Sequence, residues 1–161
     1  MLIKEFKDED FINYKKPSMF IAFPSCNFKC EIECGEHCCQ NNALSQSPNM
    51  NVSIDTLIER YMNNPITKAI VCDGLEPLDS WNDLQSFIMN FRYVSPDEIV
   101  IYTGYKENEI QDKLEWLKSY SPIVIKIGRY IPHQSYHYDE VLGVKLASDN
   151  QYGVRLEKEY E

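Results

Sequence analysis

Ala69-Ile-Val-Cys-Asp-Gly-Leu-Glu-Pro77 joins a short apolar run to a polar turn, and this combination recurs along the chain. Apolar runs of this length that are rich in β-branched and aromatic residues are typical of buried strands. The sequence has four of them, at residues 19–23, 69–72, 98–102 and 123–127. Each is followed by a segment that carries polar residues or glycine, at residues 24–51, 73–77, 103–105 and 128–130.

Helical patterns alternate with these strands. Apolar residues recur at helical spacing over residues 54–63, 81–91 and 107–120, and Ser53 is placed to cap the first of these helices. Such alternation predicts a parallel sheet with right-handed crossovers. The loops after parallel strands meet at one edge, where ligands bind. We therefore expect an α/β fold, a partial (β/α) barrel with a mostly parallel sheet, helices outside and a functional site at the rim.

The length and charge of the chain narrow its class. Its 161 residues suit a single domain over residues 1–161. Residues 1–10 are charged, and no later stretch approaches the ~20 apolar residues of a membrane span, so we expect a cytoplasmic protein that does not bind membranes. Sixteen basic and 25 acidic side chains give a net charge of −9, which disfavours nucleic acid as a partner.

Five of the six cysteines fall within fourteen residues, in Cys26-Asn-Phe-Lys-Cys-Glu-Ile-Glu-Cys-Gly-Glu-His-Cys-Cys-Gln-Asn41. Thiolates this close repel one another and oxidise readily unless a metal, a cluster or disulfides stabilise them. Disulfides are rare in a reducing cytosol, so the crowding predicts a metal or cluster site in the loop at residues 24–51. The residues alone leave a structural zinc site open beside an iron–sulfur cluster. Such a zinc site would use Cys26, Cys30, Cys34 and Cys38, with His37 as a further ligand.

Five short motifs follow one another over most of the chain. They are Cys26-x3-Cys30 with Cys39-Gln-Asn41, Gly74-Leu-Glu-Pro77, Tyr102-Thr-Gly-Tyr105, Gly128-Arg-Tyr130 and Ser148-Asp-Asn-Gln151. In this order they resemble motifs of the radical S-adenosylmethionine (SAM) superfamily, and within it those of the activating enzymes of anaerobic (class III) ribonucleotide reductase. The resemblance implies a partial barrel of the radical SAM type, with a 4Fe-4S cluster held by three cysteines.

The cysteine spacing departs from the family pattern. The family has Cys-x3-Cys-x2-Cys, whereas Cys39 lies nine residues after Cys30. The family also has Asn two places after the third cysteine, as Asn41 follows Cys39 here. We therefore favour Cys39 over Cys34 as the third ligand. The resemblance then implies cluster ligation by Cys26, Cys30 and Cys39, with Cys34 and Cys38 as alternatives.

The resemblance also implies roles for the loop after the second strand. Gly74, Leu75 and Glu76 would hold the methionyl amine of SAM, with the Glu76 carboxylate pairing the buried ammonium and Pro77 stiffening the turn. Leu75 stands where the family has glycine. If the backbone there needs a positive φ, leucine costs ~1–2 kcal/mol.

Four more residues receive roles by the same resemblance. Thr103 and Gly104 would lie against the ribose or adenine, and Asn41 would brace the cluster loop. Arg129 would meet a carboxylate of the cofactor, of a partner protein or of an acidic neighbour. Residues 131–161 have no clear period, and we expect them to close over the rim as an irregular arm.

The implied activity is reductive cleavage of SAM at the cluster to a 5′-deoxyadenosyl radical, which installs a glycyl radical on a large partner similar to anaerobic ribonucleotide reductase. A reducing electron donor such as a flavodoxin would be needed. Two alternatives stay open. One is a zinc- or cluster-binding module on the same fold without radical chemistry, and the other is a radical SAM enzyme that acts on another peptide or small molecule.

Three remaining residues have ordinary structural explanations. Cys72 ends an apolar run, so we expect it to be a small buried hydrophobe. His133 and His137 are expected to be solvated or hydrogen-bonded loop residues, since radical chemistry needs no acid–base pair.

Overall fold

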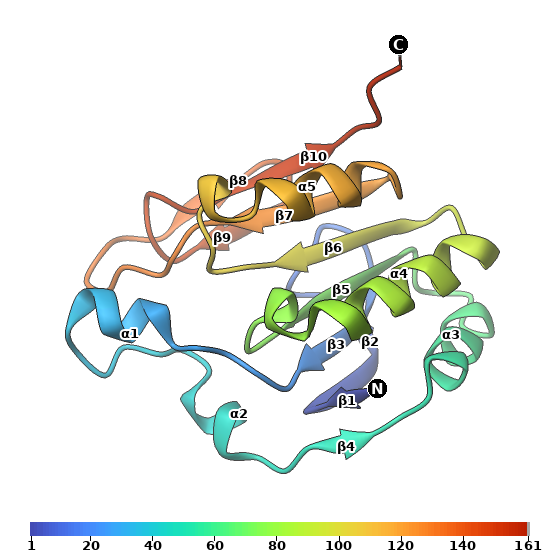
Figure 1. Cartoon of the computed structure of the whole chain (residues 1–161), viewed down its shortest axis with the longest axis horizontal. Helices are drawn as coiled ribbons and strands as arrows, with labels where there is room; N and C mark the ends of the chain where they lie inside the picture. The colour runs from blue at the N-terminus through green and yellow to red at the C-terminus, as the bar shows by residue number, and fades with distance from the viewer. Residues whose placement is uncertain (161) are drawn as a thin grey trace.

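A six-stranded sheet forms the centre of the computed structural model, which describes residues 1–160 (Figure 1). The strand order is β10-β7-β6-β5-β3-β2. The four predicted strands are confirmed, and each pair of neighbours among them runs parallel. They are β3 (Ser18–Phe23), β5 (Ala69–Gly74), β6 (Glu98–Tyr102) and β7 (Ile123–Ile127). That this sheet is a partial barrel of the radical SAM type stays a prediction.

Both edge strands are antiparallel and were not predicted from the sequence. They are β2 (Glu5–Asp10), which pairs with β3, and β10 (Tyr152–Leu156), which pairs with β7. All residues of β2 except Phe6 are charged, a pattern that an edge strand tolerates because one side faces solvent. The regular strand β10 differs from the irregular arm expected over residues 131–161. Two small antiparallel pairs complete the strands: β1 (Leu2–Ile3) with β4 (Met50–Asn51), and β8 (His137–Asp139) with β9 (Val144–Leu146).

Helices cover one face of the sheet (Figure 1). They are α3 (Ile54–Met62), α4 (Trp81–Val94) and α5 (Gln111–Lys118). Ser53 caps α3 as predicted, because its Oγ accepts a hydrogen bond from the Thr56 N–H (3.1 Å). Short 3-10 turns precede the other two: η1 (Pro77–Ser80) leads into α4, and η2 (Glu107–Glu109) interrupts the helix expected over residues 107–120. The loop at residues 24–51 carries two short helices, α1 (Lys29–Cys34) and α2 (Asn42–Gln46).

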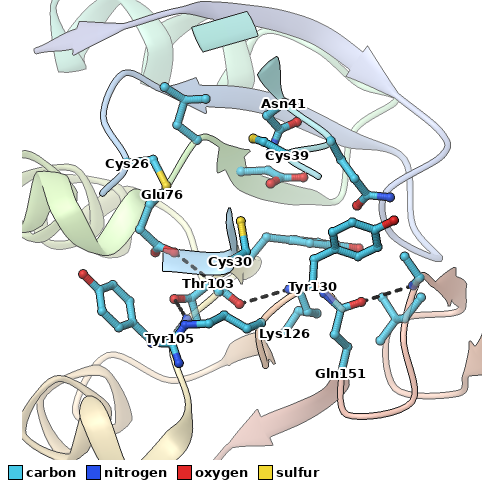
Figure 2. A pocket seen from close by; sticks show the side chains of 18 of the residues that line it. Cys26, Cys30, Cys39, Asn41, Glu76, Thr103, Tyr105, Lys126, Tyr130 and Gln151 are labelled. Atoms are coloured by element: carbon cyan, nitrogen blue, oxygen red, sulfur yellow. Dashed lines mark hydrogen bonds between the residues drawn. The ribbon is translucent and has the colours of Figure 1, made fainter. Parts of the chain in front are cut away.

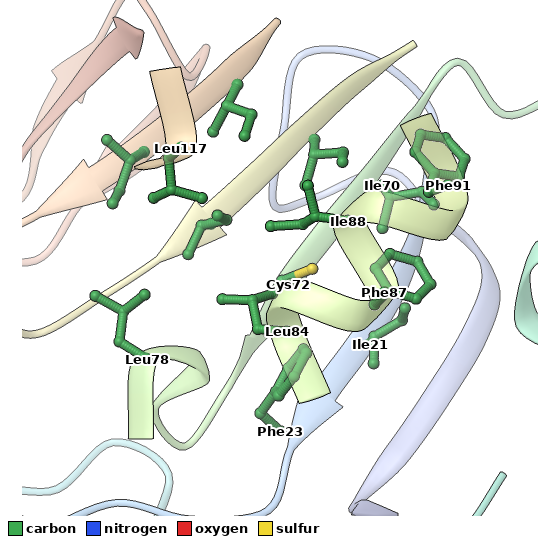
Figure 3. Packing of buried hydrophobic residues seen from close by; sticks show 14 of the residues in the cluster. Ile21, Phe23, Ile70, Cys72, Leu78, Leu84, Phe87, Ile88, Phe91 and Leu117 are labelled. Atoms are coloured by element: carbon green, nitrogen blue, oxygen red, sulfur yellow. The ribbon is translucent and has the colours of Figure 1, made fainter. Parts of the chain in front are cut away.

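The four parallel strands are buried on both faces, which explains why they are mostly apolar. Figure 3 shows the larger core, where Ile21, Ile70 and Cys72 lie beneath Phe87 and Phe91 of α4. The smaller core lies on the opposite face, where alternate strand residues meet Tyr14 and the segment around β9. It contains Phe20, Ala22, Val71, Val100, Val124, Leu142 and Leu146. No helix within residues 1–160 has the length and apolar character needed to span a membrane.

Candidate cofactor site

A cavity of about 350 Å³ lies where the loops after β3, β5, β6 and β7 meet (Figure 2). This is the place expected from the parallel sheet, since the carboxyl ends of its strands share one edge. Nine of the eleven residues that were given a ligand or cofactor-binding role from the sequence line it: Cys26, Cys30, Cys39, Asn41, Leu75, Glu76, Thr103, Gly104 and Arg129. Gly74 and Pro77 are buried and do not belong to the lining.

Three of the five clustered cysteines belong to the cavity, and they come from different parts of the loop. Cys26 follows β3, Cys30 lies in α1, and Cys39 precedes α2; Figure 2 shows their thiols around one space. Burial raises the pKa of the Cys26 thiol to about 11, and it raises the pKa of Cys30 and Cys39 as well. These thiols therefore favour the protonated form until a cation compensates the thiolate charge.

Cys34 and Cys38 do not line the cavity, and their sulfur atoms lie 2.6 Å from each other. The zinc site considered from the sequence would need both of them to converge with Cys26 and Cys30. Within residues 1–160, no three His, Cys, Asp or Glu side chains converge on a point that would suit one metal ion. A cubane cluster does not require its cysteine ligands to converge on one point, because each thiolate binds a different iron atom.

The backbone after Cys26 explains how the loop turns into α1. Phe28 has a left-handed conformation (φ 54°), and its N–H lies 3.2 Å from the Cys26 Sγ. A left-handed residue reverses the chain sharply, so Cys30 returns toward Cys26 within four positions. The amide contact to sulfur favours the thiolate at Cys26.

Asn41 ties the cluster loop to the sheet. Its Nδ2 donates to the carbonyl oxygen of Gly74, the last residue of β5, over 2.5 Å. Gly74 itself has φ +91°, and a Cβ there would lie 2.7 Å from both Ala22 Cα and Phe23 N on β3. Only glycine fits this position. Leu75 next to it is not among the described residues with positive φ, so the backbone strain considered from the sequence does not arise.

Glu76 links two loops beneath the cavity. Its side chain is buried (4% exposed), and its carboxylate accepts hydrogen bonds from the N–H groups of Leu78 (3.0 Å) and Gly104 (2.8 Å). It thereby caps η1 and holds the loop after β6 against the loop after β5. Burial raises the pKa of Glu76 to about 7, in spite of these two donors. A cation beside it would favour its ionised form.

We expect this carboxyl to make the cluster-free protein less stable as the pH rises. Glu76 has a pKa of about 7 when folded, against 4.5 for an unperturbed glutamate, so the folded state holds its proton more tightly. The stabilisation is complete below pH 4.5 and is lost as the pH rises through about 7, by roughly 3 kcal/mol. Burial also raises the pKa of Asp73 to about 6, which adds to the same trend.

Urea unfolding of the cluster-free full chain at pH 5 and pH 8 measures this effect. The matched variant is Glu76→Gln, which keeps the size of the side chain and cannot ionise. Its free energy of unfolding should change less between the two pH values than that of the unaltered chain. Equal changes in both proteins would assign the pH dependence to other groups.

A buried lysine lies under the loop after β6. Lys126 is 7% exposed, and its Nζ donates to the carbonyl oxygens of Thr103 (3.0 Å) and Gly128 (3.1 Å). Burial lowers its pKa, and the carboxylates of Asp73 and Glu76 oppose that shift. An ammonium has three donors, so one N–H stays available on a residue that lines the cavity.

Lys126 and Asp73 received no role from the sequence motifs, although strand periodicity could have revealed them. Val71, Val100 and Val124 belong to the smaller core, and side chains two positions apart on a strand share a face. Two positions further along the same strands come Asp73, Tyr102 and Lys126, and all three line the cavity. The apolar pattern of this face therefore turns polar where the cavity begins.

Arg129 meets acidic neighbours, one of the alternatives weighed from the sequence. It is 3% exposed and pairs with Glu33 of α1 (2.9 Å) and with both carboxylate oxygens of Glu109 (2.7 Å each). It thus fastens α1 to the loop after β7. Its Nε is buried without a hydrogen-bond partner, although the residue lines the cavity.

Two of the three residues that were expected to have only structural roles, Cys72, His133 and His137, lie as predicted. Cys72 is completely buried in the larger core, which confirms the prediction. His133 is exposed and its Nε2 lies 2.7 Å from Glu36, as expected for a hydrogen-bonded loop residue. His137 lies on β8 rather than in a loop, and its Nδ1 is buried without a partner.

Comparison with known proteins gives one result that bears on the cavity. A family profile described as a 4Fe-4S single cluster domain matches residues 18–151. The matched span begins at β3 and includes every residue that lines the cavity except Asn13. No curated protein and no solved structure gives a significant match.

Proposed function

Since this chain belongs to the 4Fe-4S single cluster domain family and is an iron–sulfur protein, we propose that it is a radical SAM activating enzyme. Cys26, Cys30 and Cys39 would hold the cluster, and SAM would bind beside it in the same cavity. The single observation that carries the proposal is the lining of that cavity. Three of the clustered thiols share it with Glu76, Thr103 and Gly104, while Cys34 and Cys38 stay outside.

The residues of the cavity fit both groups. Partial burial raises the pKa of all three thiols, so their thiolates need the positive charge that a cluster supplies, and three ligands leave one iron of a cubane free for SAM. The volume of about 350 Å³ lies within the ~300–1,000 Å³ of small-molecule sites. The unpartnered Nε of Arg129 is a donor that a ligand oxygen would satisfy.

When bound, these groups supply one-electron reductive cleavage of SAM to methionine and a 5′-deoxyadenosyl radical. The protein contributes binding and orientation. The buried carboxyl of Glu76 would pair with the methionyl ammonium, which favours the ionised form of a group whose pKa burial has raised. Lys126 would direct its remaining N–H at the methionyl carboxylate. Its own ammonium is held in place by hydrogen bonds to the carbonyl oxygens of Thr103 and Gly128.

The target of the radical in this proposal is a glycine on a large protein similar to anaerobic ribonucleotide reductase, with electrons from a donor such as a flavodoxin. This part rests on the resemblance of the five motifs. Loops from β5, β6 and β7 surround the cavity, so the partner would approach at the carboxyl edge of the sheet.

Anaerobic reconstitution followed by addition of SAM and dithionite tests the proposal. We expect about four irons and four sulfides per chain, an electron paramagnetic resonance signal that changes on adding SAM, and formation of 5′-deoxyadenosine. S-adenosylhomocysteine, which lacks the sulfonium, should give no 5′-deoxyadenosine. Tyr93→Ser is a suitable control variant, because Tyr93 is 91% exposed on α4 and does not line the cavity.

A cluster of the expected composition that neither responds to SAM nor cleaves it would contradict the proposal. The protein would then be a cluster-binding module without radical chemistry. Cleavage of SAM without radical transfer to a glycyl-radical protein would instead direct the search to another peptide or small molecule.

A further inference from the structure

Cys34 and Cys38 form a thiol pair whose geometry is local. Cys34 is the last residue of α1, and Gly35 ends the helix in a left-handed conformation (φ 71°). The Cys38 N–H then donates to the carbonyl of Glu36 (2.9 Å), so the chain turns back on itself. The two sulfur atoms lie 2.6 Å apart. A bond of about 2.0 Å needs only a small further approach.

The pair lies between the second and third cysteines of the proposed cluster site. Cys30 is one helical turn before Cys34, and its carbonyl oxygen is 3.7 Å from the Cys38 sulfur. Cys39 follows Cys38 directly, and its N–H donates to the Glu31 carboxylate (3.0 Å). A link between Cys34 and Cys38 therefore restricts how far Cys39 can move from Cys30.

We propose that Cys34 and Cys38 form a reversible disulfide that clamps the loop segment between Cys30 and Cys39, and that neither ligates the cluster. The effect of this clamp on the cluster rests on the proposed function. The disulfide itself depends only on the turn at Gly35 and on the contact between the two sulfurs.

The reaction is thiol–disulfide exchange with a small-molecule disulfide. One cysteine thiolate attacks that disulfide, forms a mixed disulfide and releases one small thiol. The second cysteine then displaces the other small thiol and forms the bond between Cys34 and Cys38. Two cysteine thiols are oxidised, one disulfide is reduced to two thiols, and the two protons pass to these products. An excess of a small thiol reverses the reaction.

The charge near the pair indicates which reagent reacts with it. Glu31, Glu33 and Glu36 lie in the same segment, and Arg129 pairs with Glu33, so the approach of a charged disulfide would depend on its charge. The test therefore uses uncharged bis(2-hydroxyethyl) disulfide with 2-mercaptoethanol. The cluster-free full chain is equilibrated at increasing ratios of disulfide to thiol, quenched in acid, alkylated and mapped by peptide mass spectrometry.

We expect the link between Cys34 and Cys38 to form at a ratio about tenfold lower than any other cysteine pair requires. In Cys34→Ser, the remaining Cys38 should carry 2-hydroxyethanethiol in mixed disulfide, without an internal link. Parallel oxidation of all five cysteines, or links dominated by Cys26, Cys30 or Cys39, would overturn the proposal.

A second measurement tests the clamp on reconstituted protein. With the pair closed, a chelator should remove iron about tenfold more slowly than with the pair open. The double variant Cys34→Ser/Cys38→Ser should bind as much iron at saturation as the unaltered chain and lose it at the rate of the open form. Less iron at saturation would indicate that these cysteines are ligands. Equal rates of iron loss with the pair open and closed would contradict the proposed clamp.

The two proposals fail separately. Peptide mapping of the cluster-free chain needs neither the cluster nor SAM, so absence of SAM cleavage leaves its result intact. Conversely, unselective oxidation would overturn the disulfide while the cluster assignment stands.

Discussion

Cys39→Ser should lower SAM-dependent formation of 5′-deoxyadenosine by more than about 100-fold, because changes to groups that merely support metal ligands already cost about 10–100-fold. The same variant should retain less iron and sulfide after anaerobic reconstitution. The reason is geometric. Cys39 lines the cavity with Cys26 and Cys30, and Asn41 two positions later fastens this part of the loop to the end of β5.

Two controls isolate the ligand role of Cys39. Cys34→Ser should keep full iron and sulfide, because Cys34 does not line the cavity. Cys72→Ala removes the buried thiol of the larger core, far in the sequence from the loop, and should also bind a complete cluster. Full iron content in Cys39→Ser combined with loss in Cys34→Ser would move the third ligand to Cys34.

Gly74→Ala should reduce the free energy of unfolding of the cluster-free chain by about 3 kcal/mol or more, since it combines a left-handed backbone with overpacking. The new methyl would stand 2.7 Å from Ala22 Cα and from Phe23 N, which belong to the neighbouring strand and cannot rotate away. Because the Gly74 carbonyl also accepts the bond from Asn41, any relief of this clash displaces the cluster loop. Urea unfolding monitored by circular dichroism measures the cost.

Two further glycines provide a graded comparison. Gly35 has φ +71°, and no atom lies within 4 Å of the place that an alanine methyl would take, so Gly35→Ala should cost only the backbone term of about 1–2 kcal/mol. At Gly104 the φ is not positive and a methyl would meet only Glu76 at 3.6 Å, so Gly104→Ala should change stability by less than about 1 kcal/mol. An equal cost at Gly35 and Gly74 would show that the close approach to β3 contributes nothing.

Apolar patterning identified the elements that bury most of their residues. The four parallel strands are buried on both faces and appear as continuous apolar runs, whereas α3 appears as an apolar repeat of about 3.6 residues that follows Ser53. The apolar pattern did not predict the two edge strands. Strand β2 carries charges and β10 follows an irregular segment, and each is held by pairing with a neighbour rather than by its own apolar pattern.

The candidate site was also predicted only in part from the sequence. Sequence motifs placed Cys26, Cys30, Cys39 and Glu76 on loops that the parallel sheet must bring together, and the cavity contains all four. They did not reveal that Arg129 is already paired with Glu33 and Glu109, since those three residues are distant in sequence.

The sequence by itself determined that this protein has four parallel central strands and a cysteine-rich loop at the carboxyl end of the first of them, because apolar runs indicate buried strands and their alternation with helices implies parallel crossovers. Only the tertiary structure decided which thiols share the cavity. The spacing between the cysteines does not distinguish Cys34, Cys38 and Cys39, and the sequence favoured Cys39 only through its resemblance at Asn41. In the structure, the turn at Gly35 pairs Cys34 with Cys38, and the bond from Asn41 to Gly74 directs Cys39 toward Cys26 and Cys30.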